Sequence, residues 1–389
     1  MPNRPRHAVA LLIETSHAYG RGLIEGVSQY VRANSNWSIL LPEIQREGAP
    51  PPWLANWRGN GLIARIETPE MAEAVRQTQL PTVDVSAVGF LPEAPRVATD
   101  DAAIARQAAE HLLTRGFLNL AYCGNPRYSW SNRRSQHFRA AAEAAGARCL
   151  EMQGTDAPER EVGWETLRRR IAHWVDTLPR PVGIMTCCDQ RAQQLLDVCR
   201  TLGVAVPEEV AVVGVDDDPL LCELCEPSLS SVVPDSQRVG YLAAQTLDRM
   251  MQGRKIAAAL QTVLPRGVQT RQSTDVTAID DPDVAAALRF IRQHACDGIQ
   301  VRDVVQEAPL SRRVLEARFK RRVGRTPHEE ITRVRMLRIQ ALLAETDLPL
   351  AAIAQRTGFN YVEYMNEAFK KQTGCTPGQF RKQAHTAGK

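Results

Sequence analysis

The sequence predicts a chain in two parts: an α/β domain of two lobes with parallel, doubly wound sheets, and an all-α C-terminal domain with two helix-turn-helix units. Between residues 8 and 270, short apolar runs alternate with amphipathic helical segments, as in parallel sheets covered by helices on both faces. Between Ser311 and Arg381 one motif occurs twice, which indicates a duplicated unit. With 389 residues the chain has room for two or three domains.

The elements of the α/β part follow from apolar runs and helical periodicity. The runs predict strands at Ala8–Ile13, Ile39–Leu41, Gly61–Ala64, Thr82–Val85, Arg96–Ala98, Leu118–Cys123, Arg148–Met152, Val182–Thr186 and Val210–Val215. Helical spacing predicts helices at Gly22–Asn34, Pro69–Gln77, Ala102–Arg115, Asn132–Ala145, Glu165–Leu178, Asp189–Leu202 and Gln237–Gln252. A single sheet rarely uses a segment this long, so two similar lobes are expected, with ligands at the carboxyl ends of the strands.

The repeated motif spans Phe319–Pro327 and Phe369–Pro377, each with Phe-Lys, Gly and Thr-Pro at the same spacing. A helix and a short break precede each copy, and the next helix is expected to open at a capping residue, Ser311 or Asn360. The apolar positions of these two helices are Val314, Leu315, Phe319 and Val323, and Tyr364, Met365, Ala368 and Phe369. Two helices joined by a tight turn are typical of helix-turn-helix units.

The geometry and charge of this region favour DNA as its partner. A helix predicted from Pro327 to Glu345 is a strut of about 28 Å, near the ~34 Å between successive major-groove faces. Residues 302–338 hold eleven Lys and Arg against five Asp and Glu. Residues 280–389 carry 19 basic and 13 acidic side chains, whereas the rest carries 29 and 31, so the positive charge is concentrated where DNA binding is predicted.

Residues 283–384 resemble the AraC/XylS-type DNA-binding domain. The matching signature is Gly358-Phe359, Phe369-Lys370-Lys371, Gly374, Thr376-Pro377 and Phe380-Arg381. The resemblance implies that the exposed starts of the two recognition helices reach bases and that the following basic residues contact phosphates. The implied DNA-binding residues are Ser311, Arg312, Arg313, Glu316, Lys320, Arg321, Asn360, Tyr361, Glu363, Asn366, Lys370 and Lys371. The basic residue that the family often has two positions before the motif Phe is replaced here by Ala317 in one copy and by Glu367 in the other.

The chain from Val97 onward resembles the LacI/GalR and periplasmic sugar-binding fold. The matching stretches are Asp100-Asp101 before a helix, Arg134–Arg139, Cys188-Asp189 and Val213–Asp217. LacI-type repressors carry a helix-turn-helix headpiece before the first strand, whereas here a strand is already expected at Ala8. DNA binding is therefore expected at the C-terminus instead.

The two resemblances divide the chain into a sugar-binding domain at residues 1–270, a linker at 271–282 and a DNA-binding domain at 283–389. This combination resembles the xylose-responsive activators of bacterial xylose operons. The resemblance implies a regulator that binds operator DNA and D-xylose and, as an activator, contacts RNA polymerase. A homodimer is expected because two DNA-binding domains on paired half-sites multiply affinity. A cytoplasmic protein is expected because the sequence shows neither a signal peptide nor a run long enough to span a bilayer. A different pentose or hexose as effector, and repression instead of activation, stay open as alternatives.

A sugar site needs carboxylates or Arg to grip hydroxyls and an aromatic ring to stack. Strand-end positions and the sugar-binding resemblance nominate Glu14, Tyr19, Asp100, Asp101, Arg134, Asp189 and Asp216 as ligand-binding residues. Tyr128 and Trp130 are stacking candidates. Helix capping is an alternative role for Asp101 and Asp189, exposure on a helix for Arg134, and simple packing for Trp130.

The remaining motifs argue against catalysis, cofactors and metals. No nucleophile elbow, P-loop or zinc-protease motif occurs, and the Gly20–Gly26 glycines begin too far beyond the first strand for a dinucleotide loop. Asp216–Asp218 and Cys222–Cys225 lack further ligands for a metal site. No signal peptide or membrane-spanning run is evident. A doubly wound enzyme fused to a DNA-binding domain, and a constitutive DNA-binding protein, are the rival hypotheses.

Overall fold

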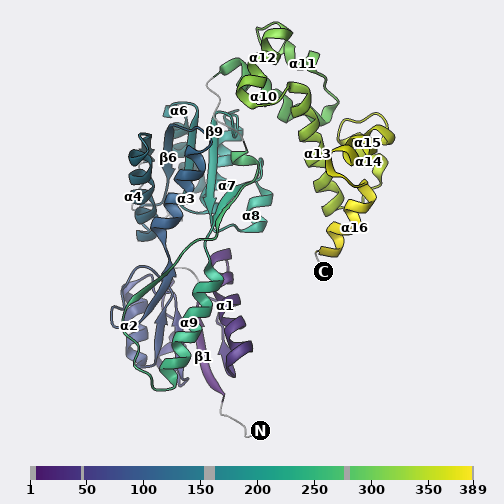
Figure 1. The fold of residues 1–389 in the computed structure, drawn as a ribbon. Coiled ribbons are helices and arrows are strands. Elements are labelled where there is room, and N and C mark those ends of the chain that lie inside the picture. Colours follow the sequence, from purple (N-terminus) through teal and green to yellow (C-terminus); the bar gives the residue numbers. More distant parts are fainter. Residues whose placement is uncertain (1–5, 45–47, 153–162, 276–280, 388–389) are drawn as a thin grey trace. The chain divides into compact units, whose positions relative to one another are not determined.

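The structure is a computed structural model that describes residues 6–44, 48–152, 163–275 and 281–387. The chain divides into two compact units, Met1–Asp275 and Val276–Lys389, and Figure 1 labels many of their elements. The first unit holds the strands and the second is helical, so each is described by itself. Residues 271–275, expected in the linker, belong to the first unit and include the short 3-10 helix Gln272–Thr274.

The first lobe is a parallel sheet in the order β11-β5-β4-β3-β1-β2. Its strands are β1 (His7–Leu12), β2 (Trp37–Leu40), β3 (Gly61–Ala64), β4 (Thr82–Asp84), β5 (Arg96–Thr99) and β11 (Leu260–Val263). Successive side chains of β1 pack in the hydrophobic cores on opposite faces of the sheet, because side chains alternate across a strand. Val9 and Leu11 pack with α1 (Ala18–Asn34) and α9 (Ser236–Met251), while Ala10 and Leu12 pack with α2 (Pro69–Thr78).

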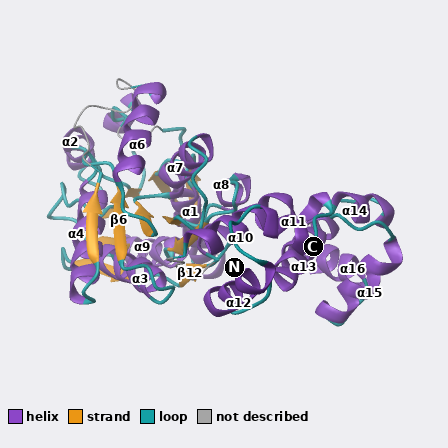
Figure 2. Cartoon of the chain, turned by 90° about the horizontal axis from the view of Figure 1, so that it is seen from above, coloured by secondary structure: helices purple, strands orange, loops and turns teal. Residues whose placement is uncertain are grey.

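The second lobe is a sheet in the order β12-β10-β9-β8-β6-β7, parallel except for the edge strand β12. Its strands are β6 (Asn119–Cys123), β7 (Arg148–Glu151), β8 (Val182–Thr186), β9 (Val210–Val215), β10 (Ser230–Val233) and β12 (Gly267–Gln269). Its helices are α3 (Asp101–Leu113), α4 (Ser129–Ala144), α6 (Trp164–Thr177), α7 (Asp189–Thr201) and α8 (Pro219–Leu224). Figure 2 shows the strands lying between layers of helices.

The predicted doubly wound fold with two lobes is confirmed. Every predicted strand forms: β3, β8 and β9 have the predicted bounds, and the other strands differ by one or two residues at one or both ends. Helices α1 and α4 begin earlier than expected, at Ala18 and Ser129. Strands β10, β11 and β12 were not predicted. They are short, and their polar or exposed residues give no apolar run.

The chain passes between the lobes at three places, because β5, β10 and β11 are each followed by an element of the other lobe. The crossings lie at Asp100, at 234–235 and at 264–266. The carboxyl ends of strands in both lobes therefore point to the same space between the lobes.

The second unit is two similar helical halves that share one long helix. Its helices are α10 (Pro282–His294), α11 (Val301–Gln306), α12 (Arg312–Val323), α13 (Pro327–Glu345), α14 (Leu350–Arg356), α15 (Val362–Thr373) and α16 (Pro377–Ala387). Ile331 of α13 packs in the core of the first half with Phe319, and Ile339 packs in the core of the second half with Phe369. Helix α13 thereby has the role of the predicted strut.

The duplication extends to the helix ends. Gly324 and Gly374 both end a helix with φ 79°, a conformation that favours glycine. Thr326 and Thr376 each begin the next helix, and each exchanges hydrogen bonds with the residue three positions on, Glu329 or Gln379.

One detail of the predicted recognition helices was wrong, and their apolar positions are not all buried. Val314 and Tyr364, two of these apolar positions, are 44% and 65% exposed, because the core contacts at this turn come from the next residues, Leu315 and Met365. The N-cap of α15 is Tyr361 and not Asn360. Ser311 is the N-cap of α12, as expected, although its side chain makes no capping hydrogen bond.

Candidate ligand cavity and DNA-binding helices

A cavity of about 220 Å³ lies between the two lobes of the first unit, at the carboxyl ends of their strands. This volume is below the roughly 300–1,000 Å³ of sites for drug-sized ligands, so the cavity suits a molecule as small as a monosaccharide. Charged and aromatic side chains dominate its walls, and the first lobe contributes His17, Tyr19, Arg65, Glu67, Ser86 and Thr99. The second lobe contributes Asp101, Asn125, Tyr128, Trp130, Arg134, Cys187, Cys188, Asp189, Gln190, Arg191, Gln194, Asp216 and Asp218.

The first-lobe wall is organised by Arg65, which follows β3. Its guanidinium lies 5.0 Å from the centre of the Tyr19 ring and pairs with Glu67 at 3.1 Å and with Glu14. Burial alone would lower the pKa of Arg65, but Glu67 and Glu14 outweigh it and raise the pKa. Burial raises the pKa of Tyr19. This wall therefore presents a fixed cation beside a neutral phenol.

The second-lobe wall is organised in the same way by Arg134 of α4, which is buried. Its Nε donates to Asp101 Oδ1 at 2.9 Å, and its Nη1 donates to the carbonyl of Cys187 at 2.7 Å. The guanidinium also lies 4.9 Å from the centre of the Trp130 ring, on which Tyr128 stacks. Burial by itself would lower the pKa of Arg134, yet the carboxylates of Asp101 and Asp216 raise it. Arg134 is therefore a charged donor held in one orientation.

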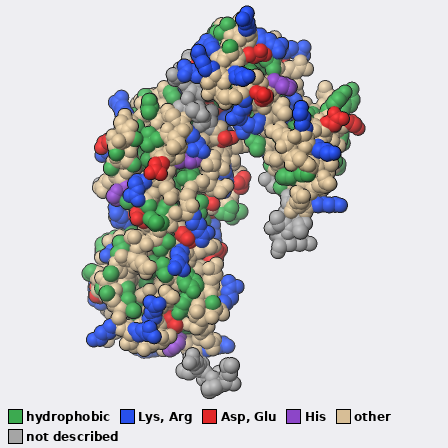
Figure 3. Space-filling model, viewed as in Figure 1, with side chains coloured by type: hydrophobic (Ala, Val, Ile, Leu, Met, Phe, Trp, Pro, Cys, Tyr) green, Lys and Arg blue, Asp and Glu red, His purple; other side chains and the backbone are tan. Residues whose placement is uncertain are grey.

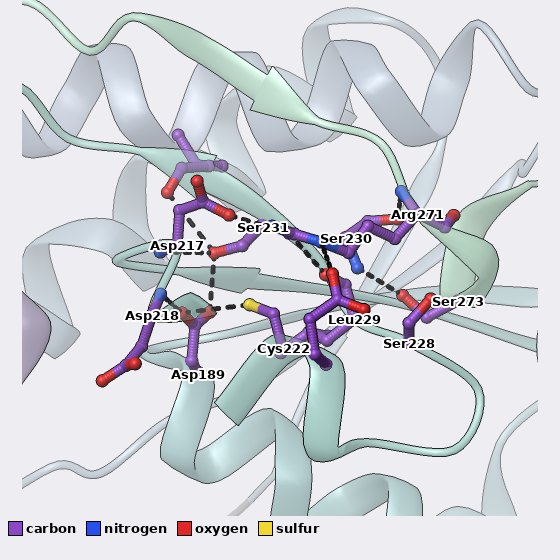
Figure 4. Close-up of polar contacts among 12 residues, drawn as sticks. Asp189, Asp217, Asp218, Cys222, Ser228, Leu229, Ser230, Ser231, Arg271 and Ser273 are labelled. Atoms are coloured by element: carbon purple, nitrogen blue, oxygen red, sulfur yellow. Dashed lines mark hydrogen bonds and ion pairs between the residues drawn. The ribbon is translucent and has the colours of Figure 1, made fainter. Parts of the chain in front are cut away.

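The floor near β9 and β10 carries carboxylates that are already hydrogen-bonded to the protein, as Figure 4 shows. Asp189 Oδ1 accepts from the Ser231 hydroxyl at 2.6 Å, and Oδ2 accepts from the backbone N–H of Asp218 at 2.8 Å. Burial and the neighbouring Asp216 raise the pKa of Asp189 well above its usual range. The S–H of Cys222 also donates to Asp189 Oδ2, at 3.6 Å, so three protein donors hold this carboxyl group in place at the cavity wall.

The turn after β9 is strained. Asp216 has φ 114° and Asp217 has φ 50°, values that L side chains rarely adopt. Arg271 stabilises this turn by pairing with Asp217 at 2.7 Å, and the N–H of Asp217 donates to Ser231 at 3.0 Å. Backbone strain of this kind is concentrated at ligand sites, where the surroundings hold it in place. The turn thus fixes the cavity-lining Asp216.

Behind the first-lobe wall, Ser86 connects the cavity to a fully buried carboxyl group, Asp84. The Ser86 hydroxyl lies 2.8 Å from the carbonyl of Ile66 and 3.0 Å from Asp84 Oδ2. A hydroxyl has one proton, so it can donate to only one of these two oxygens. Burial raises the pKa of Asp84 to about 7, and a protonated Asp84 can donate to Ser86 while Ser86 donates to Ile66.

Five of the nominated ligand-binding residues line the cavity, namely Tyr19, Asp101, Arg134, Asp189 and Asp216. Glu14 and Asp100 do not. Glu14 is buried against Arg65, and Asp100 is the N-cap of α3, where its side chain accepts from the N–H of Ala103 at 2.9 Å. Arg65 and Glu67 were missed, although they follow β3 and the strand-end rule applies to them equally.

The first recognition helix, α12, exposes most of its nominated DNA-binding residues. Ser311, Arg312, Arg313, Lys320 and Arg321 are exposed. Glu316 is half-buried and accepts from Arg312 at 2.9 Å, so these two side chains satisfy each other until one of them is recruited to a base. Figure 3 shows Lys and Arg dense over the α10–α12 part of the second unit.

The second recognition helix, α15, exposes Asn360, Tyr361, Glu363, Lys370 and Lys371. Asn366 differs, because its Oδ1 is buried and has no hydrogen-bond partner among the described residues. Bidentate recognition of adenine uses both ends of the amide, so Asn366 has to rotate before it can read a base in that way.

Two exposed apolar side chains extend the list of possible base contacts. Val314 and Tyr364 occupy equivalent positions of the two recognition helices, beside the predicted polar contacts. An apolar side chain at such a position can contact the methyl group of thymine. The sequence pattern missed this role because it identified both residues only as apolar positions at helical spacing.

Comparisons with known proteins match the whole architecture. Residues 8–102 match a XylR N-terminal domain, residues 109–274 a periplasmic binding protein-like domain, and residues 304–383 a helix-turn-helix domain. The chain is 34% identical to the xylose operon regulatory protein of Escherichia coli K12 over 97% of both chains. It is 31% identical to the protein of that name from Haemophilus influenzae, over 96% of this chain and 98% of the relative. The chain belongs to the family of xylose operon regulatory proteins.

A solved structure supports the same assignment. The structure of the xylose-binding transcription activator xylR matches with a TM-score of 0.83 and 33% identity, over 97% of this chain and 98% of the other. Proteins of this family regulate transcription, so this chain is a DNA-binding, sugar-responsive regulator and not an enzyme. Among the described residues no cluster of His, Cys, Asp and Glu could hold a metal ion. In the same described part of the chain, no helix has the length and apolar character needed to span a membrane.

Proposed function

We propose that this regulator is a D-xylose-dependent activator of xylose catabolic genes. The observation that carries the proposal is the small cavity in which fixed charges from both lobes face each other, Arg65 with Glu67 on one wall and Arg134 with Asp101 on the other. A pentose has hydroxyl groups around its whole ring and can bond to both walls at once, which favours the closed form of the two lobes. The family supplies the identity of the sugar.

We assign the ligand contacts to Tyr19, Asp101, Arg134, Asp189 and Asp216. Each already has a protein partner, so little side-chain entropy is lost when a sugar binds. Glu14 acts through Arg65, and Asp100 acts only as a helix cap. The Trp130 ring offers an apolar face for the C–H groups of the sugar while it also positions Arg134.

DNA binding is assigned to the nominated residues of α12 and α15, with Arg312, Arg313 and Glu363 facing bases and Lys320, Arg321, Lys370 and Lys371 facing phosphates. A cytoplasmic homodimer fits this role, because two copies on paired half-sites multiply affinity. As an activator, the protein would contact RNA polymerase at the promoter. Repression is the second possibility, and it predicts that the sugar lowers transcription.

The test is the thermal midpoint of the full chain with a panel of pentoses and hexoses at millimolar concentration. A sugar at 100 times its Kd adds about 2.7 kcal/mol to the native state, a shift of several degrees for a unit of this size. We expect the largest shift with D-xylose, and a xylose-promoter reporter is expected to rise with the same sugar. A larger shift with another sugar would reassign the effector, and no shift with any sugar would refute the proposed ligand class.

A further inference from the structure

Two adjacent thiols form part of the cavity wall. Cys187 follows β8 and is buried, and Cys188 is the half-buried N-cap of α7; both line the cavity. Their sulfur atoms are 3.8 Å apart, and neither residue is in a disulfide. The S–H of Cys187 is directed at the sulfur of Cys188. Neither thiol has a part in the sugar contacts assigned above.

We propose that Cys187 and Cys188 form a thiol switch that a low-molecular-weight disulfide oxidises reversibly, and that the oxidised form excludes the sugar. Cys188 is the attacking thiol, because it is the partly exposed member of the pair and lies at a helix N-terminus, a setting common to reactive thiols. Its sulfur attacks the oxidant R–S–S–R, forms a mixed disulfide and releases one R–SH.

Cys187 completes the reaction, because its sulfur already lies 3.8 Å from the sulfur of Cys188. Its sulfur attacks the sulfur of Cys188 in the mixed disulfide and expels the second R–SH. The net change is two thiols and R–S–S–R to one intramolecular disulfide and two R–SH, a two-electron oxidation of the protein. The hydrogen bond to Cys188, and then burial, raise the pKa of Cys187.

The short distance between consecutive Cα atoms makes a disulfide between these two residues easy to reduce. Consecutive Cα atoms are about 3.8 Å apart, whereas disulfides usually join Cα atoms about 4.4–6.8 Å apart. A disulfide between Cys187 and Cys188 is therefore strained, and strained disulfides are easily reduced. Such a bond suits regulation rather than permanent cross-linking.

Closing the bond changes the sugar site directly. The two sulfur atoms must approach from 3.8 Å to about 2.05 Å, which twists the peptide between the two residues. The carbonyl of Cys187 lies in that peptide and accepts from Arg134 Nη1 at 2.7 Å. Cys188 also precedes Asp189, the first residue of α7. Oxidation thus displaces the carbonyl that holds Arg134 and the residue to which Asp189 is covalently joined.

The chemical experiment uses the full chain and needs no sugar. The protein is treated with oxidised glutathione, remaining thiols are alkylated, and peptides are analysed by mass spectrometry. We expect an unalkylated peptide two hydrogens lighter that contains both Cys187 and Cys188, restored by dithiothreitol. Cys188→Ser abolishes this product, whereas Cys149→Ser, a half-buried thiol of β7 outside the cavity lining, retains it. Stable glutathione adducts alone, or pairing with other cysteines, would overturn the thiol switch.

The functional experiment rests on the proposed sugar binding. Calorimetry with D-xylose compares oxidised and reduced protein within each variant. Affinity is expected to fall at least tenfold on oxidation in the parent and in Cys149→Ser, and to stay unchanged in Cys188→Ser. Equal affinity of the oxidised and reduced parent would overturn the exclusion of sugar. If the reduced parent binds no sugar, the proposed function fails, while the mass-spectrometric result still decides the thiol switch.

Discussion

Replacing the buried Asp84 by Asn is expected to stabilise the first unit, and to do so increasingly as the pH rises. Asn keeps an oxygen that accepts from the N–H groups of Ser86 (2.7 Å) and Ile66 (3.3 Å). Its NH₂ group can donate to the Ser86 hydroxyl, in the place of the carboxyl proton. Asp84→Asn therefore preserves the hydrogen bonds of the protonated carboxyl and removes its titration.

The magnitude follows from the pKa of Asp84, which burial raises from 3.8 to about 7. A folded pKa above the unfolded one means that the folded state binds the extra proton, so stability falls as the pH rises from about 4 to about 7. Asp84 is fully buried, so solvent screening requires little discount. Between pH 5 and pH 8 the carboxyl passes through about two pH units of this range. At about 1.4 kcal/mol per unit, the advantage of Asp84→Asn is expected to grow by about 3 kcal/mol.

Tryptophan fluorescence is a selective assay for this effect, because all six Trp residues lie in the first unit. Urea unfolding of the parent and of Asp84→Asn is measured at pH 5, 6, 7 and 8. Asp176→Asn, a change at an exposed position of α6, is the matched control and is expected to show no trend with pH. A constant difference between pH 5 and pH 8, or a less stable Asp84→Asn at pH 8, would refute the reasoning.

Three further substitutions test other parts of the molecule. Arg134→Met removes one of the two Arg partners of the buried Asp101 and leaves Arg133 in place. It is expected to lower D-xylose affinity by more than a hundredfold and stability by about 2 kcal/mol in calorimetry and urea unfolding, because a charged hydrogen bond is lost. Arg139→Met removes a more exposed pair and is expected to have little effect in the same assays. His111→Gln removes an imidazole whose pKa is lowered by burial to about 4. The parent therefore loses folding stability as the pH falls from about 6.5 to 4, because the unfolded chain binds the proton more readily. In urea unfolding followed by fluorescence, His111→Gln is expected to lose about 3 kcal/mol less stability than the parent over that range. Lys370→Gln is expected to reduce the slope of log affinity for operator DNA against log salt by about 0.9 in titrations between low and high salt, and an unchanged slope would remove Lys370 from the phosphate contacts.

The sequence was sufficient for the features that depend on local periodicity. Most strands of both sheets up to β9 are apolar runs, and Phe319 and Phe369 mark the cores of the two helical halves, so pattern alone located them. The same reasoning failed at Val314 and Tyr364. A helix buries only part of its circumference, and a spacing that fits either of two adjacent residues does not tell which one the neighbouring helix covers.

The candidate site was predictable as far as its residues follow strands. Asp101, Asp189 and Asp216 were found by that rule, and Arg65 could have been. The roles of these side chains depend on partners far away in the chain, which no spacing encodes. Asp100 and Asp101 are adjacent, yet Asp100 caps a helix and Asp101 pairs with Arg134, because the N-cap and the first residue of α3 face different neighbours.

Strand β10 was missed by the apolar pattern for the same reason that it supports the cavity. Ser230 and Ser231 gave it too little apolar character to be predicted as a strand, although both are fully buried. Both hydroxyl groups are hydrogen-bonded inside the protein. Ser231 holds Asp189 and the N–H of Asp217, while Ser230 bonds the backbone of Arg271, whose side chain pairs with the same Asp217 (Figure 4). Buried hydroxyls are costly unless they are paired, so these serines are explained by the site they support. The two serines that kept β10 from being predicted as a strand are thus the residues that hold Asp189 and Asp217 in place before any ligand binds.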